Sequence, residues 1–167
     1  MKINAGMMSS SSDEWTTPRW LFDRLNEKFQ FTLDAAASPA NALCEKYYVW
    51  PDGLCDWTGE RVYANPPYGD IKTWARHFTE QAGKAQLIVA LVPARVDTAW
   101  WQDFIKTADL IHFVRGRLRF GDSKNSAPFP SALAFWFGLD ALLERPKRSK
   151  STCLQESSGS GSPTRPD

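Results

Sequence analysis

The chain has 167 residues, enough for one domain, and 43% of them are hydrophobic, including eight tryptophans. Its 20 basic and 19 acidic residues leave a net charge of +1, so any contact with a nucleic acid must depend on local patches. We expect no membrane span, because no run of about 18 apolar residues occurs. Three cysteines without a CxxC pair, and two histidines without ligand-like neighbours, predict no metal site and favour plain thiols in a reducing cytoplasm.

Composition divides the chain into three segments. Residues 1–12 end in four consecutive serines and are expected to be a flexible N-terminal lead-in. Residues 13–143 carry the apolar patterns and are expected to form one compact domain. Residues 144–167 are first basic and then rich in serine and glycine, a composition that buries too little apolar surface to offset the entropy of ordering. We therefore expect a disordered tail.

Helices and strands are expected in alternation along the domain. Thr17 and Pro18 are typical of a helix start, with a hydroxyl N-cap before a proline, and apolar residues at a spacing of four continue to Phe29. Further helices are expected near residues 71–82 and 98–106, the latter with Trp101 and Phe104 or Ile105 inward. Strands are expected over residues 31–33, 61–64, 86–92, 110–114, 117–120 and 132–137.

This alternation predicts an α/β fold, in which helices pack on the faces of a sheet. The continuous apolar run over residues 86–92 is typical of a buried parallel strand. The strands at 117–120 and 132–137 are joined by a polar loop that contains proline, and we expect them to form an antiparallel edge.

The segment Asn65-Pro66-Pro67-Tyr68 carries the most chemical information. Asn-Pro and Pro-Pro are common in ordinary turns, so a turn is the simplest interpretation. However, the segment directly follows an apolar strand, where ligands bind in open α/β sheets. This position favours a functional interpretation.

The residue types suit methylation of an aromatic amine, whose lone pair is delocalised into its ring. The amide oxygen of Asn65 and the carbonyl of Pro66, held by two fixed φ angles, can accept both N–H hydrogens and stabilise the charge that develops on nitrogen. Tyr68 offers a flat face for a base. A base in a duplex would first have to be flipped out of the stack.

A cofactor pocket is expected earlier in the chain. Asp34, Ala35 and Ala36 follow a predicted strand, and the small residues allow a ligand close to the backbone, while Asp34 offers an acceptor. A capped strand end is the alternative. Asp56 could bind an adenine amine of the cofactor with Trp57 packed nearby, although Asp56 also suits a turn.

Taken together, these residues resemble the phage-type DNA N-6-adenine methyltransferase family over about residues 13–137. The resemblance rests on several segments in one order: 13–18 (DEWTTP), 31–38 (FTLDAAAS), 41–44 (NALC), 47–48 (YY), 53–54 (GL), 56–57 (DW), 65–69 (NPPYG), 91–95 (LVPAR) and 116–120 (GRLRF).

This resemblance implies a class I, Rossmann-like fold that uses S-adenosylmethionine. It implies that Thr16, Thr17 and Pro18 border the cofactor's amino-acid end, with Asp34 and Asp56 in its pocket, and that residues 65–68 form the catalytic loop. Two features depart from larger methyltransferases. The Asp34 segment lacks glycines, and the 31 positions from Asp34 to Asn65 leave little room for a strand-helix-strand unit.

Contacts to double-stranded DNA would have to come from loops. Arg115, Arg117 and Arg119 would share one face of a strand and could meet phosphates, although a solvated face is equally compatible. Lys124 and Asn125 lie in a polar loop that could read base edges. Arg95, just past a strand, could line the substrate cleft.

The sequence thus predicts a site-specific DNA adenine methyltransferase that acts on the exocyclic amine of a flipped adenine. Two alternatives stay open. The same chemistry could act on RNA bases or a protein glutamine, or the chain could be a non-catalytic DNA-binding accessory protein. The resemblance also implies a phage or prophage protein of the bacterial host cytoplasm. It predicts neither an oligomeric state nor a recognition sequence.

Overall fold

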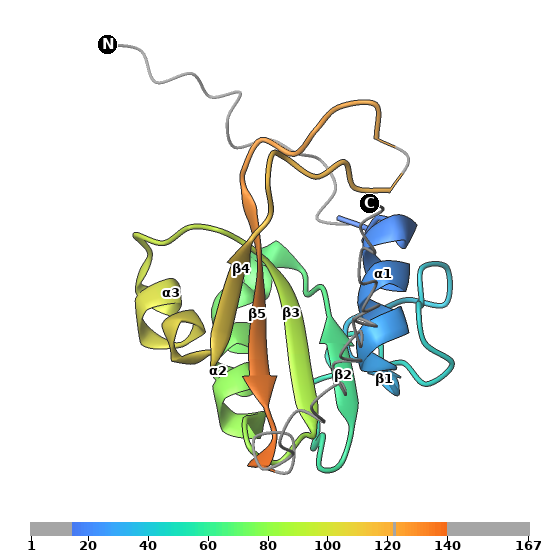
Figure 1. Ribbon diagram of the computed structural model, residues 1–167, viewed down its shortest axis with the longest axis vertical. Helices are drawn as coiled ribbons and strands as arrows, with labels where there is room; N and C mark the ends of the chain where they lie inside the picture. The colour runs from blue at the N-terminus through green and yellow to red at the C-terminus, as the bar shows by residue number, and fades with distance from the viewer. Residues whose placement is uncertain (1–14, 122, 140–167) are drawn as a thin grey trace, which may run out of the picture.

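The computed structural model describes residues 15–121 and 123–139, and the expectations for residues 1–12 and 144–167 lie outside these ranges. The elements form a mixed α/β fold around a five-stranded sheet (Figure 1). The helices are α1 (Arg19–Phe29), α2 (Ile71–Gln81) and α3 (Ala99–Asp103), with short 3-10 turns η2 (Tyr68–Asp70) and η3 (Ile105–Thr107). The strands are β1 (Leu33–Asp34), β2 (Arg61–Ala64), β3 (Leu87–Pro93), β4 (Leu110–Phe113) and β5 (Ser131–Phe137).

The strand order in the sheet is β1-β2-β3-β5-β4. The first three strands are parallel, and β5 pairs antiparallel with both β3 and β4. β5 therefore lies inside the sheet, and the expectation that it forms an antiparallel edge with a strand at 117–120 is wrong: its second neighbour is β4. The carboxyl ends of β1, β2 and β3 meet at one end of the sheet.

Residues 117–120 belong to the long connection from β4 to β5 rather than to a strand. Gly116 has a φ of +79°, which turns the chain away from β4. Leu118 and Phe120 are buried, whereas Arg117 and Arg119 are exposed. The strand-like alternation is therefore real, but the apolar residues pack on an aromatic cluster instead of pairing with a strand.

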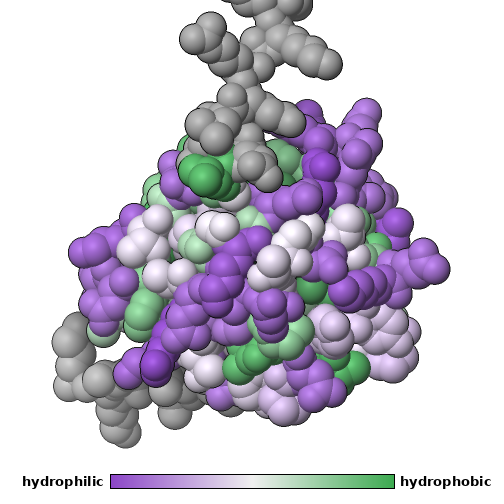
Figure 2. Space-filling model, turned by 90° about the horizontal axis from the view of Figure 1, so that it is seen from below, coloured by the Kyte–Doolittle hydropathy of each residue, from purple (hydrophilic) through white to green (hydrophobic). Residues whose placement is uncertain are grey.

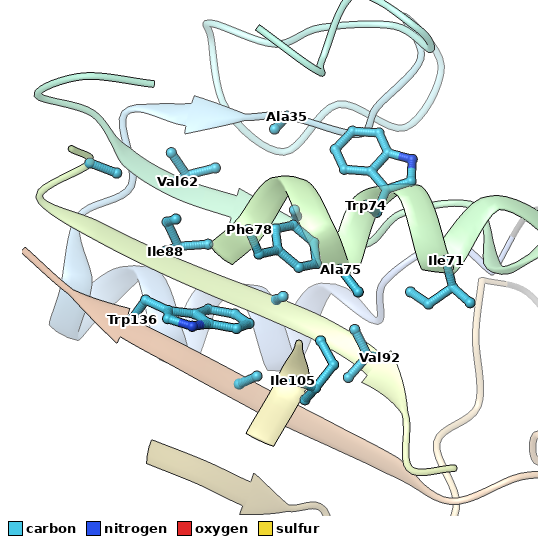
Figure 3. Close-up of a cluster of buried hydrophobic side chains, with 14 of the residues drawn as sticks. Ala35, Val62, Ile71, Trp74, Ala75, Phe78, Ile88, Val92, Ile105 and Trp136 are labelled. Atoms are coloured by element: carbon cyan, nitrogen blue, oxygen red, sulfur yellow. The ribbon is translucent and has the colours of Figure 1, made fainter. Parts of the chain in front are cut away.

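Side chains alternate between the two faces of the sheet and build one core on each. On one face, Trp74 and Phe78 of α2 pack over Val62 and Ile88 (Figure 3). On the other, Leu21 and Phe22 of α1 join a cluster that includes Tyr63, Val89 and Phe135, and that is completed by Leu118, Phe120 and Phe129 from the β4–β5 connection. The fold thus has helices on both faces, as the sequence predicts.

Helix α1 begins at Arg19, with Pro18 at the N-cap position and no side-chain capping hydrogen bond. Thr17 was expected to cap this helix, and that expectation is wrong. Its hydroxyl instead contacts Tyr63 on β2 and the amide of Asn65. The side chain therefore links the start of α1 to the end of β2.

The connection between β1 and β2, residues 35–60, contains no helix and no strand beyond one isolated bridge between Asp34 and Tyr47. This agrees with the short spacing between Asp34 and Asn65 in the sequence. Because no further strand pairs outside β1 in the described part of the chain, β1 forms the sheet edge and the connection folds back over its carboxyl end.

The surface at the other end of the sheet, away from the carboxyl ends of β1, β2 and β3, is predominantly hydrophilic, with apolar side chains in small separate groups (Figure 2). Within residues 15–121 and 123–139, no helix has the length and apolar character needed to cross a membrane. In the same ranges, no three His, Cys, Asp or Glu side chains come together in the way that metal ligands do.

Candidate active site

A cleft opens at the carboxyl ends of β1 and β2, where ligands bind in open α/β sheets. Its volume of about 180 Å³ exceeds that of a ~150 Å³ cavity known to take up benzene, so it has room for at least one planar ring. The cleft is lined by three segments: Trp15, Thr16 and Thr17 before α1; Asp34, Ala36, Ala37, Ser38, Asn41, Leu43, Val49 and Trp50 after β1; and Tyr63, Asn65, Pro66 and Pro67 at the end of β2.

Both polar atoms of the Asn65 amide, Nδ2 and Oδ1, form hydrogen bonds within the protein. Nδ2 donates to the backbone carbonyl of Trp15 and, at 3.0 Å, to Oγ1 of Thr17. Oδ1 accepts from the hydroxyl of Tyr68 at 3.2 Å. A carbonyl oxygen can only accept, so the contact with Trp15 assigns the nitrogen to that side of the amide. Oδ1 keeps a second lone pair for a ligand.

Behind Asn65, two hydroxyl groups form a buried pair. Oγ1 of Thr17 lies 2.9 Å from Oη of Tyr63, and these residues are 6% and 0% exposed. Burial raises the pKa of Tyr63 well above its ordinary value, so its hydroxyl keeps its proton. The pair therefore provides neutral hydrogen-bonding groups behind the amide.

Tyr68 lies at the start of η2, directly after the two prolines. Burial raises its pKa, so its hydroxyl stays protonated and can donate to Asn65. Its ring packs edge-on against Phe129, with centroids 5.4 Å apart, and Phe120. The wall of the cleft includes Pro66 and Pro67 but not Tyr68. In this arrangement the hydroxyl of Tyr68, rather than its ring face, is linked to the site.

Asp34 is a buried carboxylate in the cleft wall, 3% exposed. Its two oxygens accept from the backbone N–H groups of Leu43, at 3.1 Å, and Ala36, at 3.4 Å. Desolvation raises the pKa of Asp34 to about 6, although both N–H groups act in the opposite direction. Asp34 is therefore ionised at neutral pH and titrates just below it.

Asp56 and Trp57, expected in the cofactor pocket, do not line this cleft. Trp57 is fully buried, donates from Nε1 to the carbonyl of Gly53 at 3.0 Å, and packs against His77 of α2. Asp56 is exposed and accepts from Thr58 at 3.0 Å. Trp57 lies in the core because the connection carries it beneath α2, a long-range contact that its local sequence does not indicate.

The aromatic side chain that does reach the cleft from this connection is Trp50. It is 41% exposed, and its ring lies 5.8 Å from that of Trp74. Ala35 also differs from expectation: it is fully buried beside Trp74 (Figure 3), whereas Ala36 and Ala37 line the cleft. No local sequence signal distinguished Trp50 from Trp57, since both are aromatic residues of one irregular connection.

Thr16 and Thr17 line the cleft, whereas Pro18 is buried at the start of α1 and is not part of the wall; that these residues border a cofactor stays a prediction. Trp15, Asn41 and Tyr63 are wall residues that the sequence did not single out. Tyr63 lay within a predicted strand, but nothing in its local pattern indicated which face of the sheet would carry the site.

The candidate DNA-contacting residues are all exposed, on the β4–β5 connection and just after β3. The connection extends beyond the sheet and arches toward the start of α1 (Figure 1). The backbone of Ala94, next to Arg95, bonds to Pro130 at the base of this connection at 2.8 Å. The residues in question are Arg95, Arg115, Arg117, Arg119, Lys124 and Asn125. Among the described residues, none of the five cations of this group forms an ion pair with a carboxylate.

The fold and site define an α/β protein in which an oriented amide and a buried carboxylate face one cleft. A family model described as DNA N-6-adenine-methyltransferase (Dam) matches residues 5–139, which is most of the chain. The chain belongs to this family. It is also similar to a DNA N-6-adenine-methyltransferase of Escherichia phage T1, at 32% identity over 130 residues. This match covers 75% of the chain and 55% of that relative, so the chain spans about half the relative's length.

Proposed function

We propose that this chain transfers a methyl group from S-adenosylmethionine to the exocyclic amine of adenine in double-stranded DNA. Family membership and the phage T1 relative support this activity. The observation that carries the proposal is the oriented amide of Asn65, whose oxygen retains an unused lone pair at a cleft beside the parallel strand ends. An amide oxygen in this position is suited to accept from an amine.

The part of the cleft after β1 fits the cofactor. S-adenosylmethionine, when bound, supplies an electrophilic methyl group on a positively charged sulfur. The carboxylate of Asp34 suits a hydroxyl or ammonium group of such a ligand, the small Ala36 permits close approach to the backbone, and Trp50 offers an apolar face. Thr16 and Thr17 close the other side of the cleft. Asp34 thus combines with Trp50, rather than Asp56 with Trp57, in the proposed cofactor site.

The residues after β2 would bind the amine of the substrate. Oδ1 of Asn65 accepts one N–H hydrogen, and the carbonyl of Pro66 accepts the other. Both oxygens then stabilise the positive charge that develops on nitrogen, and the amine releases one proton to solvent after methylation. Tyr68, through its bond to Oδ1, limits the movement of the amide.

The target base must leave the duplex to reach this cleft, so we propose that adenine is flipped. The exposed cations of the β4–β5 connection and Arg95 lie at the cleft end of the sheet, where they suit contacts to phosphates, with Lys124 and Asn125 nearer the bases. The three parallel strands, the α2 crossover and the cleft position also support a class I, Rossmann-like assignment. The phage relative supports a role in a bacterial host cell.

The proposal is tested by incorporation of labelled methyl from S-adenosylmethionine into unmethylated duplex DNA, followed by nucleoside analysis. We expect N-6-methyladenine, and we expect Asn65→Ala to abolish its formation while leaving cofactor binding intact. Asn26→Ala is the matched control, because the Asn26 side chain also bonds to the backbone, in this case accepting from the N–H of Phe31 at 2.7 Å, but does not line the cleft.

Competing substrates in the same assay separate the alternatives. Label that enters RNA or a protein glutamine in preference to DNA would overturn the proposed substrate while keeping the chemistry. Tight cofactor binding without transfer to any of the three substrates would support a non-catalytic accessory role instead.

A further inference from the structure

An asparagine that accepts from a substrate must present its oxygen, yet its amide has nearly the same shape when turned by 180° about the last side-chain bond. The orientation of Asn65 therefore has to be set by its neighbours. Four groups could set it: the Trp15 carbonyl and the Thr17 hydroxyl on the nitrogen, the Tyr68 hydroxyl on the oxygen, and the Tyr63 hydroxyl through its contact with Thr17.

We propose that Thr17 and Tyr63 are positioning residues for catalysis, which together with the Trp15 carbonyl hold the Asn65 amide with its oxygen toward the substrate. We call this set of groups the amide clamp. The inference rests on the proposed role of Asn65 as an acceptor and goes beyond it, because it assigns a function to a hydroxyl pair that itself needs no contact with the reacting atoms.

The hydrogen-bonding capacities of the clamp allow one orientation. Both Nδ2 hydrogens are used, one on the Trp15 carbonyl and one on Oγ1 of Thr17. Thr17 has a second contact at 2.9 Å to Oη of Tyr63, so its hydroxyl is engaged on both sides. In the turned amide, Oδ1 would face the Trp15 carbonyl, and two acceptors would oppose each other without a proton between them.

Burial makes the clamp selective, because water has little access to replace a lost partner. Tyr63 is fully buried and Thr17 almost so. A buried polar group left without its partner disfavours the turned amide by about tenfold or more, enough to keep the amide in one orientation. The same reasoning predicts that an aspartate at position 65 lowers activity, because one of its carboxylate oxygens would have to face the Trp15 carbonyl.

The segment that carries the clamp is itself fixed to the rest of the fold. The backbone N–H of Gly121 donates to the carbonyl of Thr16 at 2.8 Å. The ring of Trp15 packs edge-on against Phe129 and Phe120, with centroids 5.1 and 5.3 Å apart. The position of the Trp15 carbonyl is therefore fixed by the backbone bond of Thr16 and by the packing of the Trp15 ring.

The test uses Thr17→Val and Tyr63→Phe, which remove one hydroxyl each with little change of shape. In methyl transfer to duplex DNA at saturating cofactor, we expect kcat to fall at least about tenfold in each variant, which corresponds to one lost buried hydrogen bond. The dissociation constant for S-adenosylmethionine should stay within about twofold, and Thr17→Ser should restore most of kcat. Thr79→Val is the matched control, since it removes a half-buried hydroxyl of α2 that bonds to Ala75.

A second readout does not depend on turnover. The side-chain NH₂ of Asn65, observed by NMR and assigned by its absence in Asn65→Ala, should exchange slowly with solvent in the unaltered protein. It should exchange much faster in Thr17→Val and Tyr63→Phe. Isosteric Asn65→Asp should fold, bind cofactor and have a kcat at least about tenfold below that of the unaltered protein.

The outcomes separate this inference from the proposed function. If Asn65→Ala abolishes transfer while Thr17→Val and Tyr63→Phe retain kcat, the clamp is refuted and the role of Asn65 stands. Loss of cofactor affinity with unchanged kcat in Thr17→Val would also refute it, because Thr17 would then act as a cofactor ligand alone. If Asn65→Ala keeps full activity, the proposed role of Asn65 fails. Should a variant unfold, rapid exchange of the Asn65 NH₂ in the unaltered protein still refutes the clamp.

Discussion

Lowering the pH from 7 to 5 should act on Asp34 in two opposite ways, and the structure gives the size of both. The side chain is 3% exposed, and its pKa is about 6, compared with an ordinary value of 3.8 for an aspartate. The difference corresponds to about 3 kcal/mol by which burial disfavours the charged form in the folded protein. The carboxylate is nevertheless charged at pH 7, where both states of the protein have released its proton.

The first effect concerns stability. Because the folded state binds the Asp34 proton more tightly than the unfolded state, acidification through pH 6 favours folding, and this contribution is lost again as the pH rises. From pH 7 to pH 5 the gain in the free energy of unfolding is about 1 kcal/mol. This is opposite to Glu60, whose pKa is lowered by its hydrogen bond from Lys46, so the Asp34 contribution must be isolated by comparison with Asp34→Asn.

The second effect concerns the cofactor. If the charged form of Asp34 binds S-adenosylmethionine, then at pH 5 only about one tenth of the protein is ready to bind, and the dissociation constant should rise about tenfold. Calorimetric titration with the cofactor and urea unfolding, each at pH 5, 6 and 7, measure both effects. Asp34→Asn should lack the Asp34 contribution to both, so that the difference between the two proteins gives the two effects. Equal pH dependence of the two proteins in both assays would refute the assignment of these effects to Asp34.

Three further predictions follow from packing and charge. Gly53→Ala should lower the free energy of unfolding by about 1–3 kcal/mol in urea, because the added Cβ would lie 1.9 Å from the Ala35 carbonyl oxygen; an unchanged midpoint would contradict this packing. Trp50→Ala should weaken cofactor binding with little loss of stability, whereas Trp57→Ala should cost about 3–5 kcal/mol of stability; cofactor titration and thermal unfolding distinguish these results from the reverse assignment. Arg117→Ala and Arg119→Ala should each weaken binding to any duplex and reduce its salt dependence by about one ion, while Arg76→Ala on α2 should not; equal effects of all three would contradict a local DNA surface.

Much of the fold could be predicted because it depends on local patterns. The apolar run that became β3 is buried on both faces, as expected for a central parallel strand. The spacing of Trp74 and Phe78 placed the inner face of α2 correctly. The strand at 110–114 and the helix at 98–106 were also found, the latter ending after Asp103 and followed by a 3-10 turn.

The errors have a common physical origin. Arg117 to Phe120 alternates as a strand does, but its apolar side chains pack in the aromatic cluster around Phe129 and its backbone pairs with no strand in the described part of the chain. Thr17 suits an N-cap in isolation, but a buried tyrosine hydroxyl and the Asn65 amide take its hydroxyl. Trp57 is an aromatic residue beside an acid, which is compatible with a pocket as well as with a core.

The sequence by itself determined the alternation of helices and strands, the position of Asn65 to Tyr68 after a strand, and the small residues after Asp34, because these depend on neighbours a few positions away. Only the tertiary structure decided which aromatic side chain enters the cleft, how the Asn65 amide is oriented and how strongly Asp34 is desolvated. Each of these depends on contacts between distant segments, such as the 48 positions between Thr17 and Asn65. Hydrogen-bond partners and burial are set by the closed fold, and no local pattern of residue types contains them.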